Sequence, residues 1–194
     1  MRFMPLLQQN FDELRQRLKH GRGLNHASDD PVYYLIFRPE EMLTVKRCMK
    51  QWVAKLNLEG WKVHTFSMAD AIHEIIKGHD LREIWLESEC DDPLDFDSIN
   101  KTLADALMSG NALEEKLNAK LQSLTDEKSA MLFVTDLEAL HPYLRVGSLE
   151  QRLQGKFTVP TVILYPGIRA GRTTLRFLGI YPEDGNYRSI HIGG

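Results

Sequence analysis

A glycine- and threonine-containing segment near the C-terminus has residue types that bind phosphate groups. It reads GIRAGRTT, from Gly167 to Thr174, and follows an apolar run that ends at Tyr165. A phosphate-binding loop has the spacing G-x-x-x-x-G-K-[ST] between a strand and a helix, and its lysine reaches the terminal phosphates. Here the spacing is one residue short, Arg172 replaces the lysine, and strand periodicity follows instead of helix periodicity. We therefore predict a turn between two strands.

A carboxylate at a strand end is the second feature that could do chemistry. The apolar run AMLFVTD, residues 130–136, ends in Asp136, and an aspartate in such a position binds magnesium in nucleotide hydrolases. Because no phosphate loop accompanies it, we predict that Asp136 caps a helix or a turn. A nucleotide hydrolase that uses Gly167, Gly171 and Asp136 stays open as an alternative.

Acidic residues, histidines and cysteines offer no recognisable metal site. The acidic stretch between residues 83 and 97 lacks the spacing and the glycine of a calcium loop. The seven histidines lack spacing such as H-E-x-x-H, and Cys48 and Cys90 lie far apart. We predict neither a metal nor a cofactor, and we interpret the acidic stretch as a solvated loop that is prone to interact with partners. Its acidic residues are Glu83, Glu87, Glu89, Asp91, Asp92, Asp95 and Asp97.

Basic residues gather near the C-terminus. Arg169 and Arg172 lie in the predicted turn, and Arg176 and Arg188 fall on runs that could share one face of a hairpin. Such a patch could bind a phosphate backbone or an acidic protein surface, or its charges could simply block pairing at a strand edge. The residues predicted to bind a partner protein or nucleic acid are Arg169, Arg172, Arg176, Tyr187 and Arg188.

The bulk composition indicates one globular domain without a global attraction for nucleic acid. The chain has 194 residues, of which 43% are hydrophobic, and its 24 Lys+Arg and 27 Asp+Glu give a net charge of -3. No run approaches the roughly 20 apolar residues that span a bilayer, and the N-terminal segment lacks the apolar core of a signal peptide. We expect a single cytoplasmic domain over residues 1–194.

Alternating strand and helix patterns predict an α/β fold. Apolar runs near 32–37, 61–66, 130–135 and 159–165 are typical of buried strands, and amphipathic helices lie between them. Residues 81–124 contain apolar stripes at helical spacing and no convincing strand, which indicates a helical insertion.

The last two alternating runs, at 174–181 and 187–192, flank the turn segment PEDGN and predict a C-terminal antiparallel hairpin. The predicted architecture therefore has three layers: a mainly parallel sheet, helices on both of its faces, and the hairpin as edge strands. This order resembles a P-loop NTPase core with a degenerate nucleotide site, which is an analogy of fold and says little about activity.

Several sequence blocks resemble the BrxB family of BREX phage-exclusion systems, long classed as a domain of unknown function. The blocks are FDELRQRL, PVYYLIFRPEEM, VTDLEALHPYLRVGSLEQRL, VPTVILYPG, LRFLG and NYRSIHI. The most specific parts are Tyr165-Pro166-Gly167, Leu175-Arg176-Phe177 and Asn186-Tyr187-Arg188. The family often has two tyrosines before that last arginine, whereas this chain has one.

The resemblance implies a role in antiviral defence and phage resistance, beside a methyltransferase, a large ATPase and a PglZ-type protein. It brings no assigned catalytic residues. We therefore expect a subunit that is not an enzyme and that acts through protein–protein interaction with other BREX proteins, a PglZ-type protein first among them, and without membrane contact. The alternative is a nucleic-acid-binding subunit that contacts DNA through the basic hairpin.

Overall fold

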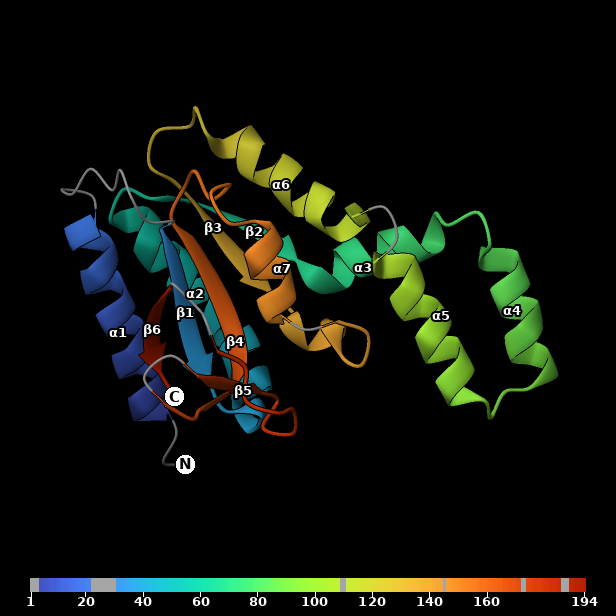
Figure 1. Ribbon diagram of the computed structural model, residues 1–194. Helices are drawn as coiled ribbons and strands as arrows, with labels where there is room; N and C mark the ends of the chain where they lie inside the picture. Colours follow the sequence, from blue (N-terminus) through green and yellow to red (C-terminus); the bar gives the residue numbers. More distant parts are fainter. Residues whose placement is uncertain (1–3, 22–30, 109–110, 145, 172–173, 186–188) are drawn as a thin grey trace.

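Six strands form a sheet at the centre of the molecule (Figure 1). They are β1 (Val32–Phe37), β2 (Lys62–Ser67), β3 (Ala130–Thr135), β4 (Thr161–Arg169), β5 (Leu175–Phe177) and β6 (Ile190–Gly193). The order is β2-β3-β4-β1-β6 with parallel neighbours, and β5 pairs antiparallel with β4. This computed structural model describes residues 4–21, 31–108, 111–144, 146–171, 174–185 and 189–194. The predicted α/β fold with a mainly parallel sheet is confirmed.

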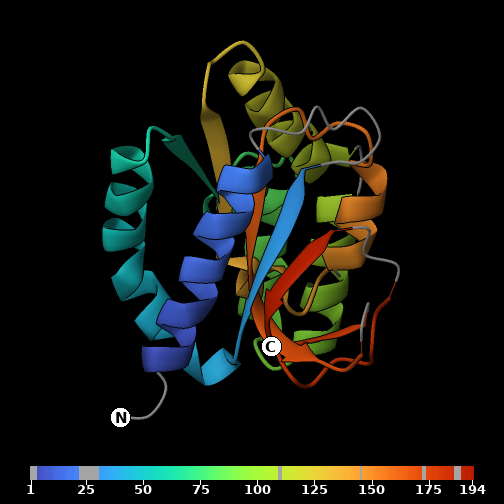
Figure 2. The same cartoon turned by 90° about the vertical axis from the view of Figure 1, so that its left-hand side faces the viewer.

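Helices cover both faces of the sheet (Figure 2). They are α1 (Met4–Gly21), α2 (Met42–Leu58), α3 (Met68–Lys77), α4 (Arg82–Asp91), α5 (Phe96–Met108), α6 (Ala112–Leu124) and α7 (Val146–Arg152), with short 3₁₀ turns η1 (Pro39–Glu41) and η3 (Leu137–Leu140). Successive residues of β1 point to opposite faces, so Tyr33 and Leu35 pack with α1 and α2, whereas Tyr34 and Ile36 pack with α3, α6 and α7. Because both faces are covered, the inner strands consist of continuous apolar runs.

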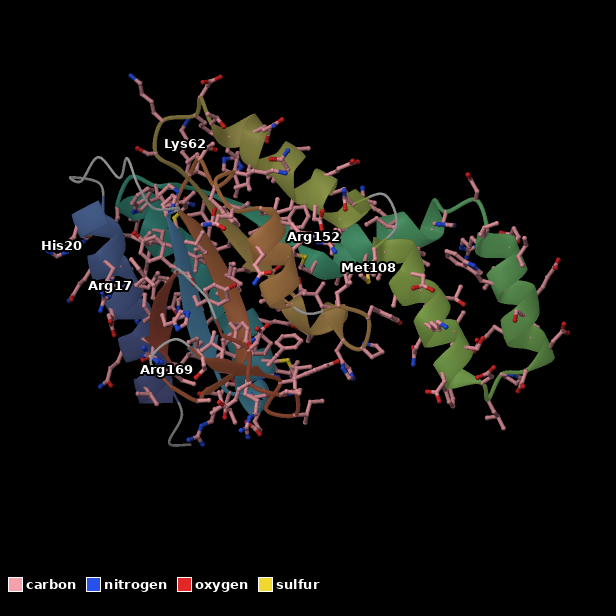
Figure 3. All side chains as sticks on the ribbon, viewed as in Figure 1. Arg17, His20, Lys62, Met108, Arg152 and Arg169 are labelled. Atoms are coloured by element: carbon pink, nitrogen blue, oxygen red, sulfur yellow. The ribbon has the colours of Figure 1, made fainter. Side chains whose placement is uncertain are left out.

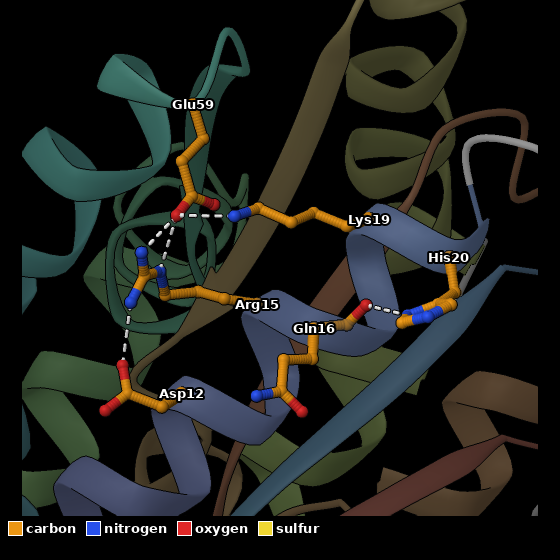
Figure 4. Close-up of polar contacts among 6 residues, drawn as sticks. All are labelled: Asp12, Arg15, Gln16, Lys19, His20 and Glu59. Atoms are coloured by element: carbon orange, nitrogen blue, oxygen red, sulfur yellow. Dashed lines mark hydrogen bonds and ion pairs between the residues drawn. The ribbon is translucent and has the colours of Figure 1, made fainter.

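An ion-pair cluster fastens α1 to the end of α2 (Figure 4). Arg15 Nε donates to Glu59 Oε1 at 2.9 Å, and Lys19 Nζ lies 3.3 Å from the same oxygen. Arg15 Nη1 also donates to Asp12 Oδ1 at 2.8 Å. Burial alone would raise the pKa of Glu59, but the hydrogen bonds from Arg15 and Lys19 outweigh it and hold that pKa below its ordinary value. The cluster therefore stabilises the layer formed by α1 and α2 at neutral pH.

The predicted pairing of the C-terminal hairpin is wrong. β5 pairs antiparallel with β4, so Ile168 lies opposite Arg176, and β6 pairs in parallel with β1. The alternating pattern of the last run fits either kind of partner. Pairing with β1 places Ile192 beside Leu35 and buries it in the layer under α1.

The helical insertion is confirmed, but its helices differ in how they pack. Four leucines of α6 are buried against the sheet: Leu113, Leu117, Leu121 and Leu124. The base of α5 packs against α3 and α6, where Ala106 and Leu107 are buried. α4 has no buried residue, and α4 and α5 extend away from the sheet (Figure 1). We refer to residues 81–98, none of which is buried, as the arm.

No helix within the described ranges is long and apolar enough to cross a membrane.

Candidate partner-binding site

The carboxyl ends of β2 and β3 bring together a polar cluster at the edge where parallel α/β sheets bind ligands. Ser67 Oγ and Thr135 Oγ1 donate to Asp136 Oδ2 at 2.9 Å and 2.7 Å. Lys46 of α2 places its ammonium 2.8 Å from Asp136 Oδ1 and 2.6 Å from Glu138 Oε1. Both oxygens of Asp136 are therefore occupied by side chains of the protein itself.

Asp136 links the end of β3 to α2 and β2 through its side chain. It precedes η3 with a left-handed backbone (φ 58°), as suits a turn residue, but its side chain makes no capping hydrogen bond. Burial alone would raise the pKa of Asp136, but hydrogen bonds from Lys46, Thr135 and Ser67 outweigh it and hold the pKa below its ordinary value of 3.8. The predicted turn position is correct, whereas the predicted capping contact is replaced by a link from β3 to α2 and β2.

We expect Asp136→Asn to lower the free energy of unfolding by about 1–2 kcal/mol at neutral pH, because asparagine suits the left-handed backbone but loses the charged contact with half-exposed Lys46. A lowered pKa means that the ionised carboxylate stabilises the fold above pH 3.8 and that this contribution disappears as the pH falls through the lowered pKa. Urea unfolding of the wild type and of Asp136→Asn should be measured from neutral pH to below pH 3.8. The difference between their free energies of unfolding should become smaller as the pH falls. A difference that stays constant at all pH values would contradict this role, and Glu87→Gln on the exposed arm serves as a control.

Of the two glycines of the phosphate-loop alternative, Gly167 has a packing role in the β4–β5 ribbon and Gly171 lies beside the ribbon. A Cβ on Gly167 would come within 2.5 Å of the Arg176 carbonyl oxygen and of the Tyr165 ring, so only glycine lets β5 approach β4. A Cβ on Gly171 would come within 2.6 Å of Thr174 Oγ1. β4 is followed by an antiparallel strand and not by a helix, which confirms the predicted strand–turn–strand arrangement.

The described basic residues near the C-terminus lie on different faces of the β4–β5 ribbon. Cross-strand partners share a face, so Arg176 shares one with Ile168, and Arg169 lies on the side of buried Leu175. Arg176 Nη2 donates to Glu183 Oε1 at 3.1 Å, and Arg169 Nε donates to the Gly171 carbonyl at 3.2 Å.

The other predicted binding residues, Arg172, Tyr187 and Arg188, lie outside the described residues. The predicted partner- or nucleic-acid-binding role of the whole set stays a prediction. Within the described ranges, no three His, Cys, Asp or Glu side chains lie where they could share a metal ion.

Exposed apolar side chains gather on the arm. Among the large apolar side chains exposed in the described residues, five belong to this short segment: Leu81, Ile84, Leu86, Leu94 and Phe96. Trp85 of α4 contacts the ring of His79, which precedes the helix, with centroids 4.4 Å apart. Figure 3 places Met108 at the base of α5 and Arg169 near the C-terminal end of the sheet, so the arm and the basic ribbon are separate surfaces.

The arm is also strongly acidic. Residues 81–97 contain seven acidic residues and one basic residue, a net charge of -6, whereas the whole chain has -3; the remainder therefore carries +3. Arg82 pairs with its neighbour Glu83 at 3.0 Å. The sequence predicted an acidic loop, which is wrong for Arg82–Asp91 because these residues form the helix α4. The sequence also did not reveal the apolar component. The available signal was the spread of Leu81, Ile84 and Leu86 around α4 instead of along one stripe.

A comparison with protein families identifies the chain. A sequence model described as "BREX protein BrxB" matches residues 64–192. The chain belongs to the BrxB family. The matched range includes the arm, Asp136 and the β4–β5 ribbon, and BrxB membership makes this protein a component of a BREX antiphage system. No curated protein and no solved structure matches the chain.

Proposed function

We propose that this BrxB protein is a non-catalytic assembly subunit and that it acts by binding another protein of its BREX system. The observation that carries this proposal is the arm, which exposes five large apolar side chains on a segment with no buried residue. Several large apolar side chains that stay exposed on one short segment are a feature of interaction sites. Other BREX proteins are the natural candidates because the family belongs to these systems.

The polar cluster at the sheet edge supports a role without catalysis. Lys46 already holds its ammonium between Asp136 and Glu138, and the Asp136 carboxylate also accepts from Ser67 and Thr135. These three contacts engage both oxygens of the Asp136 carboxylate within the protein, as in a structural link between elements. The cluster instead serves to join α2 to β2 and β3.

The partner that we place first is a PglZ-type protein, because the resemblance implies that it is encoded in the same systems. The test is co-purification of the tagged chain with each other BREX protein, one pair at a time. We expect one BREX protein to be retained through a high-salt wash, since apolar contacts are not screened by salt. Recovery of nuclease-sensitive nucleic acid and of no BREX protein would overturn the proposal and favour DNA contact by the basic residues.

A further inference from the structure

The helix α4 exposes apolar side chains in two directions. An α-helix turns by about 100° per residue, so Ile84 and Leu86 project from nearly opposite sides of the helix. Ile84 is 60% exposed and Leu86 is 45% exposed. A flat partner surface would cover only one of these side chains. Burying both requires a partner surface that contacts the helix from two sides, such as a groove with two walls.

A stripe of acidic residues lies along a third side of α4. Glu83, Glu87 and Asp91 recur every four residues and therefore follow one another along the helix surface. All three are exposed. A partner that surrounds α4 must place opposite charge near this stripe, because like charges across an interface oppose binding.

The base of the arm is fixed to the domain. α5 packs against α3 and α6 through Ala106 and Leu107, and Lys116 of α6 pairs with Glu74 of α3 at 2.7 Å. On α5, Leu107 near the base is 2% exposed, whereas Phe96 at the opposite end of the helix is 61% exposed. A fixed base reduces the conformational entropy that the tip loses on binding.

We propose that the arm inserts into a groove of the partner that is lined by apolar side chains and bordered by lysines or arginines. This inference rests on the proposed function, and it adds the surface used and the chemistry of the partner. Ile84 and Leu86 contact the two walls, Phe96 extends the apolar contact at the tip, and the stripe of Glu83, Glu87 and Asp91 pairs with the basic border.

A second copy of this chain suits the arm less well. The pocket at its sheet edge is bordered by the carboxylates of Asp136 and Glu138, with only Lys46 between them. Such a border does not attract a segment with a net charge of -6. The occupant that we propose is therefore a different protein with a basic groove, and the oligomeric state of the wild type tests the second copy.

Three variants of the full chain test this inference against the BREX protein that co-purifies with the wild type. The double variant Ile84→Gln/Leu86→Gln keeps good helix formers in α4 and should reduce recovery of that protein at least about tenfold. The variant Glu83→Lys/Glu87→Lys should reduce recovery strongly at low salt and less at high salt, because salt screens the charges. The matched control Leu58→Gln changes a leucine on α2 that is 89% exposed and should bind like the wild type.

The outcomes distinguish a failure of the proposed function from a failure of the arm as the binding surface. If the wild type retains no BREX protein, the proposed function fails and this inference fails with it. If the wild type retains one, and both arm variants retain it equally, only the arm inference is overturned. If the wild type elutes as an oligomer that the double variant converts to a monomer, the arm binds a second copy and the choice of partner is wrong. Circular dichroism and thermal unfolding should show that all variants remain folded.

Discussion

Replacing residues 82–98 with a Gly-Ser segment of equal length is expected to abolish both partner binding and BREX protection against phage while the domain stays folded. No side chain in this range is buried, so the replacement removes little of the core. Closing a flexible loop in place of two helical segments costs entropy, and we expect the free energy of unfolding to fall by only about 1–2 kcal/mol. Phage plating, co-purification and urea unfolding of the same protein measure the three quantities.

The control for this experiment is a pair of exposed leucines on the body of the domain. Leu43→Gln/Leu58→Gln removes apolar surface from α2, where both side chains are mostly exposed. Protection should be retained in this variant. Full protection by the chain that lacks the arm would show that the exposed apolar residues of α4 and α5 have no part in the antiphage function.

Trp52→Ala is expected to destabilise the domain by about 3–5 kcal/mol, the range observed when a large aromatic side chain is removed from a core. Trp52 is 1% exposed and stacks on Phe11, with ring centroids 4.6 Å apart and planes inclined by 9°. The stack joins α2 to α1 over the sheet face that contains Tyr33 and Leu35. The free energy of unfolding of a small domain is only about 5–15 kcal/mol. This variant should therefore also lose protection against phage, because less of the protein is folded.

The matched substitution Trp52→Phe should cost much less, about 1–2 kcal/mol. Phenylalanine retains the stack on Phe11, and it removes the indole N–H, which is buried without a hydrogen-bond partner in the described part of the chain. Urea unfolding of both variants gives the comparison. A loss below about 1 kcal/mol for Trp52→Ala would mean that α1 is held to the sheet by other contacts.

The strands of the sheet could be predicted from local pattern because they are buried on both faces. β1 and β3 were predicted at 32–37 and 130–135 and lie at those residues, and β2 is shifted by one residue. β4 was predicted at 159–165 and lies at Thr161–Arg169; it continues beyond residue 165 because its last three residues pair with β5. The order β2-β3-β4-β1-β6 depends on contacts between distant segments, which local pattern does not contain.

The candidate site was less predictable for the same reason. The contact of Lys46 with Asp136 joins side chains 90 positions apart in the sequence (136 − 46 = 90), and nothing in the local pattern of either segment indicates it. In the insertion, the regular spacing of Leu113, Leu117 and Leu121 marked α6 as amphipathic. The acidity of the arm was visible, but its exposure follows from where α5 leaves the body, which is a property of the assembled fold.

Hydrogen exchange of the isolated chain and of its complex with the co-purified BREX protein is the most direct test of the arm as the binding site. In the isolated chain, the amides of α4 should exchange quickly, because that helix has no buried side chain to hold it closed. In the complex, we expect strong protection to appear across residues 82–98, with the slow exchange of β1 and β3 unchanged. Unaltered exchange in the arm, with new protection at the β4–β5 ribbon around Arg169 and Arg176, would contradict our proposal and place the partner on the basic surface.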